Sequence, residues 1–337
     1  MLKLIKKKSI TLKDHFLRRN KILIKRRLGG HGDILMQRMM FEDFKTQFPH
    51  LEFSWAVPHE FIGMARNHPY VETLEVNSIN KDATNDEKFG AVYDLNVACD
   101  KQEIKSLTTH RSDIWASYCG IKLTNHNMHL SLDTNAIEET KTKLKETNPT
   151  NKTSILICSH STHNQPDDEF GLCKTLTDEQ IIKLVEQLKK LDFQVYAIHD
   201  SHLAIYEKLN VDQFTNLTSK EWMAVVSLVD YVISVDTSTF HMAGGLKKPL
   251  VGIFTFTDGK AYGKYYDFAL VQKHRDDGNW DCGPCFTYCT CPKSVNFPKP
   301  CLTELTYQDI LHGLTRVLKK FPVSKNNQKN LEIYSLL

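Results

Sequence analysis

Segments with strand-like composition alternate along the chain with segments of helical periodicity, and this alternation restricts the folds that the chain can adopt. Short apolar runs end in polar or glycine residues, and amphipathic stretches follow them. Strands are expected over 21–27, 51–57, 93–98, 153–159, 193–198, 231–236 and 249–254. Helices are expected over 109–121, 178–191 and 220–229. A further helix is expected after the glycine loop 28–33, where Leu35, Met36, Met39, Met40 and Phe44 fall at helical spacing. Because strands and helices alternate, the pattern predicts parallel, doubly wound sheets of the α/β class.

The length of 337 residues is sufficient for two domains, and a composition of 41% hydrophobic and 25% charged residues is that of a globular protein. No run approaches the roughly 18 apolar residues of a membrane span. The Asn- and Thr-rich segment 133–153 predicts a domain boundary near Pro149. The expected parts are a basic extension at 1–20, Rossmann-like domains at 21–150 and 151–310, and a C-terminal helix and tail at 311–337.

Positive charge is concentrated at the start of the chain. Residues 1–27 carry eleven Lys or Arg and one acid, Asp14, a charge of +10 that leaves about −7 for the rest of a chain whose net charge is +3. Such a segment suits an anionic membrane surface or the phosphates of a nucleic acid, and the alternative is a solvated tail. The segment lacks the apolar core of a signal peptide, which predicts a cytoplasmic protein, with peripheral contact at the inner membrane face as a further interpretation.

The loop 28–33 is the first candidate site. Gly30 and Gly32 allow the backbone to approach a ligand closely. Position 35 is Leu, so the third glycine of a dinucleotide-binding fingerprint is missing, and the loop is not a Walker A sequence. Asp33 follows the glycines at the carboxyl end of an expected strand, where ligands bind in open sheets. Its carboxylate fits a general base, and the alternative is a helix N-cap.

Two further loops place polar side chains after expected strands. After 231–236 the sequence continues through hydroxyl residues into a helix of small residues, and a helix N-terminus with hydroxyl groups suits a diphosphate. Thr237 and Ser238 alone would be ordinary capping residues, but His241 one turn later favours an anion site. The expected strand 153–159 ends at Ser159, and Ser161 follows two residues later. Lys174 lies downstream and is either part of the same site or solvated.

Together these segments resemble the family of ADP-heptose:lipopolysaccharide heptosyltransferases, glycosyltransferase family 9. The resembling stretches are 22–36, 93–95, 174–188, 231–259 and the cysteine-rich 281–306. The resemblance implies the GT-B fold, in which two Rossmann-like domains face each other across a cleft. It also implies an inverting transferase that uses a nucleoside-diphosphate sugar and needs no metal for the chemistry.

The resemblance also implies roles for individual residues. Asp33 matches the general base that deprotonates the acceptor hydroxyl, and Lys174 matches a lysine that contacts the donor phosphate. Asp236 matches the residue that holds a sugar hydroxyl. Thr237, Ser238 and His241 match the loop that cradles the diphosphate. The family usually has glycine at the position of Ser238, and its serine-rich donor loop is replaced here by residues 159–163, so the donor and the acceptor stay open.

The cysteine-rich stretch permits several interpretations. The segment 282–285 copies the thioredoxin tetrapeptide, but only 52 residues follow it, which is too few for that domain. Tetrahedral thiolate ligation of a structural zinc ion and a set of buried reduced thiols are the remaining interpretations. The four cysteines that would bind zinc are Cys282, Cys285, Cys291 and Cys301.

Three functions follow from these observations. The first is transfer of a sugar, heptose by the resemblance, to a glycan such as the lipopolysaccharide core, with Asp33 as the base. The second is sugar transfer to a nucleic-acid base, in which the basic segment 1–27 would contact phosphates. The third is a protein that binds a nucleotide sugar without catalysis.

Overall fold

The computed structural model describes residues 20–26, 29–76, 89–96, 108–161, 173–273 and 300–322. The chain divides into two compact units, Met1–Ser131 and Leu132–Leu337. The division precedes the boundary that the polar composition predicted near Pro149. The reason is the helix α7 (Thr134–Thr147), which packs against α11 (Ser219–Leu228) of the second unit although it buries little more than Ala136 and Thr140.

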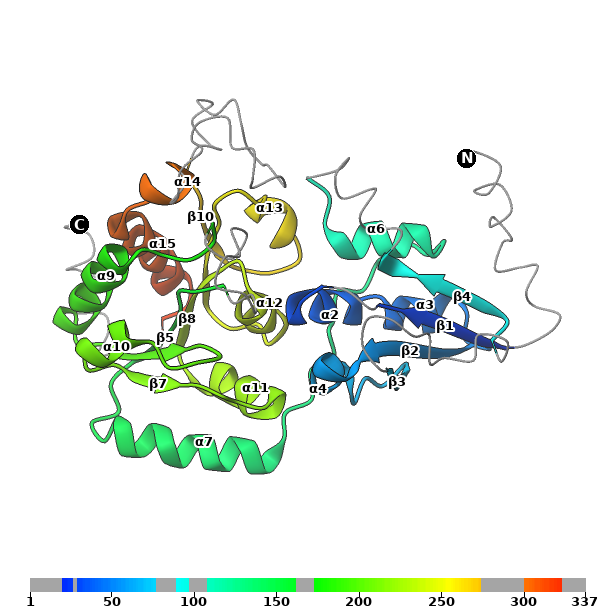
Figure 1. The fold of residues 1–337 in the computed structure, drawn as a ribbon, viewed down its shortest axis with the longest axis horizontal. Coiled ribbons are helices and arrows are strands. Elements are labelled where there is room, and N and C mark those ends of the chain that lie inside the picture. Colours follow the sequence, from blue (N-terminus) through cyan, green and yellow to red (C-terminus); the bar gives the residue numbers. More distant parts are fainter. Residues whose placement is uncertain are drawn as a thin grey trace. The chain divides into compact units, whose positions relative to one another are not determined.

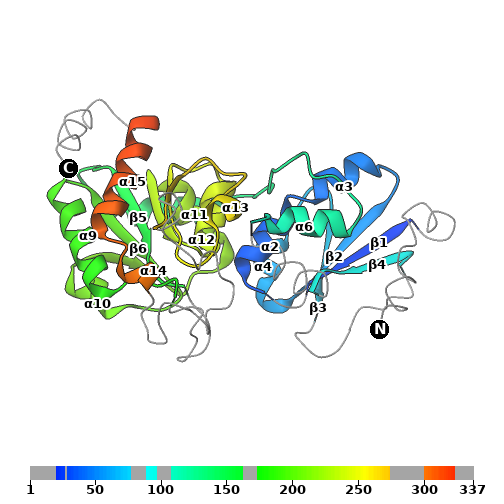
Figure 2. The same ribbon diagram turned by 90° about the horizontal axis from the view of Figure 1, so that it is seen from above.

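The first unit is a four-stranded parallel sheet with the order β3-β2-β1-β4. The strands are β1 (Lys21–Lys25), β2 (Glu52–Pro58), β3 (Glu72–Val76) and β4 (Ala91–Asp94). The helices are α2 (His31–Arg38), α3 (Phe41–Gln47), α4 (Ile62–Ala65) and α6 (Arg111–Tyr118), with a short 3-10 helix at His59–Phe61. Figures 1 and 2 show α2 and α6 close together in this unit, and the two helices are in contact. The parallel sheet that the alternating pattern predicted is confirmed.

The apolar residues expected at helical spacing after the glycine loop belong to two helices. The segment bends at Met39 and Met40, between α2 and α3. All five residues of the pattern are buried, namely Leu35, Met36, Met39, Met40 and Phe44. The sequence pattern therefore identified the buried face correctly, although the helix is interrupted.

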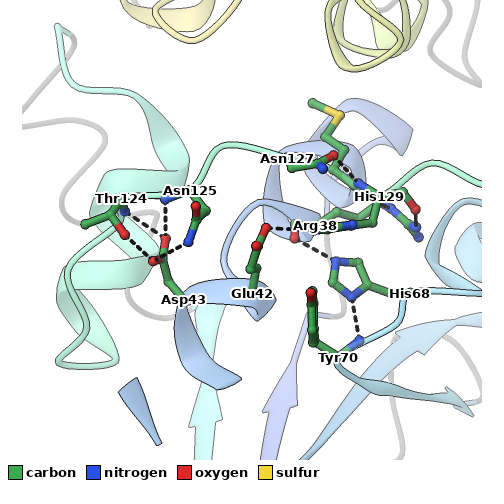
Figure 3. A network of polar contacts seen from close by, with 10 residues as sticks. Arg38, Glu42, Asp43, His68, Tyr70, Thr124, Asn125, Asn127 and His129 are labelled. Atoms are coloured by element: carbon green, nitrogen blue, oxygen red, sulfur yellow. Dashed lines mark hydrogen bonds and ion pairs between the residues drawn. The ribbon is translucent and has the colours of Figure 1, made fainter. Parts of the chain in front are cut away.

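Arg38, the last residue of α2, connects separate segments of the first unit through hydrogen bonds (Figure 3). Its buried guanidinium donates hydrogen bonds of 2.9–3.1 Å to the carbonyls of Met64, Ala65 and Arg66. It also donates to the carbonyls of Met128 and His129, at 2.6 and 2.5 Å. One side chain thus holds the end of α4 and the segment that leads into the second unit.

His68 is the polar neighbour of this arginine (Figure 3). Its Nδ1 accepts a hydrogen bond of 3.3 Å from the backbone N–H of Tyr70, so Nε2 carries the proton and donates to the carbonyl of Arg38 at 3.0 Å. Burial, Arg38 and His129 lower the pKa of His68 to about 3. The ring is therefore neutral at physiological pH and its role in this network is structural.

The second unit is a six-stranded parallel sheet with the order β10-β9-β8-β5-β6-β7. The strands are β5 (Ser154–Cys158), β6 (Gln194–Ile198), β7 (Asp212–Phe214), β8 (Tyr231–Val235), β9 (Leu250–Ile253) and β10 (Ala269–Val271). Besides α7 and α11, the helices are α9 (Asp178–Lys190), α10 (Ala204–Lys208), α12 (Ser238–Gly245), α13 (Gly259–Tyr262), α14 (Pro300–Thr303) and α15 (Tyr307–Lys320). In chain order this is the 3-2-1-4-5-6 arrangement of the Rossmann fold.

The helices of the second unit cover both faces of its sheet. Figure 1 shows α9 and α15 on one side of the strands and α11 with α12 on the other. The contacts agree, because α15 packs on α9, β9 and β10, whereas α12 packs on β8, β9 and α11. Three of these helices begin with a capping box, in which Thr177, Thr218 and Thr306 each exchange hydrogen bonds with the residue three positions later. None of the described helices is long and apolar enough to cross a membrane.

We predict that Arg38→Lys destabilises the protein by roughly 3 kcal/mol, because a lysine has three donors and would leave buried carbonyls of α4 and the 128–129 segment unpaired. Urea unfolding followed by circular dichroism measures the change. Arg66→Lys is the matched control, since the Arg66 side chain is 61% exposed and its partner Glu75 is exposed too. Equal stability of the two variants would contradict the inference that the hydrogen bonds of Arg38 stabilise the first unit.

Candidate active site

Asp33 lies in the first turn of α2. The helix begins at His31, with Gly30 as its N-cap, so the expectation that Asp33 itself could be the N-cap is wrong. The carboxylate reaches back instead, and its Oδ2 accepts a hydrogen bond of 2.9 Å from the N–H of Gly30. The glycine loop and the helix start therefore hold Asp33 at the carboxyl end of β1.

Two arginines flank this carboxylate. The Nη2 atom of Arg26 lies 3.2 Å from Oδ2, and Nη1 of Arg111 contacts Oδ1. Burial opposes the charge of Asp33, but Arg111, Arg26 and the N–H of Gly30 outweigh it and hold the pKa of the carboxyl well below its ordinary value. Asp33 is therefore ionised at any physiological pH, and its affinity for a proton is low.

The glycine before the helix is required by this arrangement. Gly29 has a φ of +113°, and a Cβ atom there would lie 2.2 Å from Oδ2 of Asp33 and 2.6 Å from Nη2 of Arg26. A Cβ atom at Gly30 would meet no atom within 4 Å. Gly30 and Gly32, predicted to bind the donor, both lie in the first unit, at the N-cap and second position of α2.

The second unit brings together three of its predicted site residues at the carboxyl edge of the sheet. The Nζ atom of Lys174 lies 2.8 Å from Oδ2 of Asp236, and both side chains are at least nine-tenths buried. Thr257, which the sequence did not single out, donates a hydrogen bond of 2.8 Å to the same oxygen. Burial would raise the pKa of Asp236, but Lys174 and His241 lower it below its ordinary value. Asp236 is therefore ionised and paired.

The start of α12 follows directly after Asp236. Thr237 is the N-cap, but its side chain does not cap the helix. Its hydroxyl instead lies 3.2 Å from that of Ser234 and 3.5 Å from the sulfur of Cys158 at the end of β5. Ser238 is the first residue of the helix. First-turn N–H groups have no partner within their own helix, which makes this end of α12 suitable for an anion.

His241 is held by an aromatic residue from outside α12. Its Nδ1 lies 2.9 Å from the hydroxyl oxygen of Tyr266, and burial raises the pKa of that tyrosine well above its ordinary value. Gly244 makes this contact possible, because a Cβ atom there would lie 2.4–2.7 Å from ring atoms of Tyr266. The small residue noted in the sequence thus has a packing function that positions His241.

Ser159 is already engaged in the structure. It accepts a hydrogen bond of 2.6 Å from the hydroxyl of Tyr206, and its oxygen lies 2.7 Å from Nδ1 of His160. Burial and the neighbouring His199 lower the pKa of His160 to about 4, so its ring is neutral at pH 7. Ser161 comes two residues after Ser159, and its N–H donates to the hydroxyl of Thr175 at 3.2 Å. These contacts hold Ser159 beside His160 and Tyr206, and Ser161 beside Thr175.

The predicted zinc ligands fall mostly outside the described part of the chain. This applies to Cys282, Cys285 and Cys291, whereas Cys301 is buried in α14. Within the described ranges, no group of three or more His, Cys, Asp or Glu residues could hold a metal ion. The basic segment is also outside these ranges, except for residues 20–26. The cysteine and N-terminal interpretations therefore stay predictions.

Sequence reasoning missed the residues that complete each carboxylate site. Arg111 is 78 positions from Asp33, and Thr257 is 21 positions from Asp236. No local motif links such residues. Arg26 lies within an expected strand, and its proximity to the glycine loop was the one available signal.

The two Rossmann-like units have the architecture of the GT-B fold, which glycosyltransferases adopt. The chain belongs to glycosyltransferase family 9 (heptosyltransferase), whose family model matches residues 95–288, more than half of the chain. No curated protein sequence matches.

Solved structures share the fold. The iron-containing dodecameric glycosyltransferase TibC from enterotoxigenic E. coli is 14% identical, with a TM-score of 0.66 over 90% of this chain and 77% of TibC. ADP-heptose lps heptosyltransferase II from E. coli is 13% identical, with a TM-score of 0.59 over 89% and 99%. A family 9 glycosyltransferase from Veillonella parvula is 10% identical, also with a TM-score of 0.59, over 89% and 97%.

We predict that Lys174→Met destabilises the protein by roughly 3–5 kcal/mol at pH 7, because it leaves the Asp236 carboxylate buried without its cation. The pKa of Asp236 in this variant rises above its unfolded value, so its folded state favours the protonated carboxyl. The deficit relative to the wild type therefore shrinks as the pH falls from 7 towards 5.

Chemical denaturation of both proteins across this pH range measures the deficit. Lys183→Met is the matched control, since Lys183 and its partner Glu179 are exposed and their pairing contributes little. A deficit that is independent of pH would show that Lys174 does not govern the ionisation of Asp236.

Proposed function

We propose that the chain transfers a heptose from a nucleoside-diphosphate sugar, ADP-heptose, to a glycan acceptor such as the lipopolysaccharide core. Family membership supports a glycosyltransferase. TibC has also been crystallised in complex with ADP-D-beta-D-heptose, and heptosyltransferase II is named for ADP-heptose and lipopolysaccharide. The observation that carries the proposal is the convergence of Lys174, Asp236 and the start of α12 at the carboxyl edge of one Rossmann sheet.

The second unit would bind the donor. The strand order reverses direction between β5 and β8, and ligands of doubly wound sheets bind at this point. The first-turn N–H groups of α12 would hold the diphosphate together with Ser238 and His241. Lys174 would also attract a phosphate through its positive charge while it stays paired with Asp236. These fixed donors stabilise the negative charge that the leaving diphosphate gains in the transition state.

Asp33 would act on the acceptor. In an inverting transfer, an acceptor hydroxyl oxygen forms a bond to the anomeric carbon as the bond from that carbon to the diphosphate oxygen breaks. The nucleoside diphosphate leaves with the electron pair, and the hydroxyl proton passes to the carboxylate of Asp33. This step needs no metal ion.

The nucleotide is tested by thermal unfolding in the presence of ADP-, UDP-, GDP- and CDP-sugars. We expect ADP-heptose to stabilise the protein, by about 2.7 kcal/mol at 100 times the dissociation constant. Asp236→Ala should abolish the shift, whereas exposed Asp212→Ala should retain it. Stabilisation by another nucleotide sugar alone would contradict the ADP-heptose assignment, and no stabilisation at all would contradict the donor site.

The base is tested with Asp33→Asn. We expect this variant to retain the donor-induced thermal shift and to lose about 10²–10⁴-fold in transfer rate to a lipopolysaccharide-core acceptor. Glu60→Gln, an exposed acid of the same unit, is the control. Unchanged transfer by Asp33→Asn, or no transfer by the wild type despite donor binding, would reject catalysis through Asp33. The latter result would favour the non-catalytic interpretation, or a nucleic-acid acceptor if added DNA or RNA becomes glycosylated.

For the cysteine-rich stretch, we propose a structural zinc ion on Cys282, Cys285, Cys291 and Cys301. Four thiolates are a typical tetrahedral zinc site. Elemental analysis of the purified protein should find one zinc per chain, and Cys285→Ser should remove it. Iron in place of zinc would overturn the identity of the metal, and no metal would favour reduced thiols.

A further inference from the structure

Tyr266 is partly exposed, but its hydroxyl group lies inside the second unit against a histidine. The hydroxyl oxygen is 2.9 Å from Nδ1 of His241, and the described ranges contain no second hydrogen-bond partner for it. Burial raises the pKa of Tyr266 well above its ordinary value, so the hydroxyl stays protonated at physiological pH. The ring of Phe240 packs edge-on against the tyrosine, with 5.5 Å between the centroids. Tyr266 is therefore a permanent O–H donor in largely aromatic surroundings.

The contact between Tyr266 and His241 allows two positions of the imidazole proton. If Nδ1 carried the proton and donated to the tyrosine oxygen, the O–H of Tyr266 would have no acceptor among the described residues. If the O–H donates to the lone pair of Nδ1, both groups are satisfied. Nδ1 is then an acceptor, and the neutral ring carries its proton on Nε2. The second arrangement leaves no buried donor unpaired at this contact and is the one that we adopt.

The side chain of His241 is directed towards the start of α12. His241 is the fourth residue of that helix, and the side chains of a helix incline towards its N-terminus. The residue is buried and lies near enough to Asp236 to lower the pKa of that carboxyl. An N–H group on Nε2 is suited to the oxygens of the diphosphate that the proposed function places there.

We propose that Tyr266 is a positioning residue of the donor site, whose hydroxyl keeps His241 neutral with its proton on Nε2 and so makes it a pH-independent hydrogen-bond donor to the diphosphate. This inference rests on the proposed function, because it concerns the same diphosphate. It goes beyond that function by giving His241 a defined protonation state and by assigning the cause to a residue outside α12.

Negative charge around His241 would otherwise favour a protonated ring. The carboxylate of Asp236 and a bound diphosphate both stabilise an imidazolium, whereas Lys174 opposes it and is itself paired with Asp236. Tyr262 presents a second tyrosine ring to His241, with 6.4 Å between the centroids. The O–H of Tyr266 can donate only to an Nδ1 atom without a proton, so it stabilises the neutral ring. A neutral N–H donor binds the diphosphate with the same strength across the physiological pH range.

Nitrogen NMR of the intact chain, labelled selectively in its histidines, measures the position of the proton without a ligand. The signals of His241 are assigned by their loss in His241→Gln. We expect the wild type to carry the proton on Nε2 from about pH 8 to about pH 5.5. In Tyr266→Phe the neutral ring loses the hydrogen bond that stabilises it, so the pKa of His241 should rise by about one pH unit.

Tyr262→Phe is the matched control for this measurement. It removes the hydroxyl of the other tyrosine ring beside His241 and keeps the contact between Tyr266 and Nδ1. We expect the pKa of His241 in this variant to equal that of the wild type. A proton on Nδ1 in the wild type, or the same pKa of His241 in Tyr266→Phe and Tyr262→Phe, would overturn the proposal.

Donor binding supplies a readout that a loss of packing alone would not produce. The probe is ADP-heptose, whose diphosphate is bonded at both ends and does not titrate between about pH 5.5 and about pH 8. A protonated His241 attracts the diphosphate more strongly than a neutral one, so the affinity of Tyr266→Phe should rise about fivefold from pH 8 to pH 5.5. The affinities of the wild type and of Tyr262→Phe should change by less than about twofold over the same range.

A double variant shows whether Tyr266 acts through His241. With His241→Gln in place, Tyr266→Phe should no longer make the affinity for ADP-heptose depend on pH, because the titrating ring is absent. A pH dependence that persists in the double variant would overturn the proposal. If Tyr266→Phe does not fold, Tyr266→Leu replaces it, and the spectrum of the wild type decides the position of the proton without any Tyr266 variant.

The proposal and the proposed function can fail separately. If ADP-heptose binds to no form of the protein, the proposed function is wrong. The NMR measurement on the ligand-free chain still decides whether Tyr266 fixes the proton of His241. If ADP-heptose binds but the proton lies on Nδ1, the donor site stands and the role of Tyr266 is rejected.

Discussion

Strands buried on both faces leave only their ends for polar chemistry, and the candidate sites depend on this constraint. Every residue of β5 and β8 is buried and uncharged, so a charged side chain is first found after the strands end. Because the strands are parallel, these ends meet at one edge of the sheet. Ser159 and Asp236 are brought to the same edge for this reason, as β5 pairs with β8. In the first unit, β1 similarly brings Arg26 to the edge where Asp33 lies in the first turn of α2.

Buried charge at these edges must be paired, and the two aspartates are paired differently. Asp236 has one lysine and one threonine hydroxyl on the same oxygen, a local arrangement that keeps a carboxylate fixed. Asp33 has a guanidinium on each oxygen and a backbone N–H as well. Both carboxylates are ionised, but two cations beside Asp33 disfavour the proton uptake that we propose for it. The same electrostatics that make burial of Asp33 tolerable therefore limit it as a base.

The sequence predicted the architecture well because the fold is encoded by local patterns. The expected strand at 231–236 and helix at 178–191 match β8 and α9 to within a residue at either end. The polar helix α7 was mistaken for a boundary, since its contact with α11 leaves only a narrow buried stripe. Asp33, Lys174 and Asp236 could be singled out as candidates because each follows an expected strand or precedes a clear helix start. Arg111 and Thr257 were not, because the partners of a charge depend on packing between distant segments.

The way in which Asp33 is paired bears on how such a site can avoid wasteful chemistry. A permanently strong base beside a bound nucleotide sugar would activate water as readily as an acceptor hydroxyl. A carboxylate held by two arginines does not, and its release requires a group that competes for those arginines. Water cannot compete, since it is neutral and cannot fill a guanidinium fork as an oxyanion does.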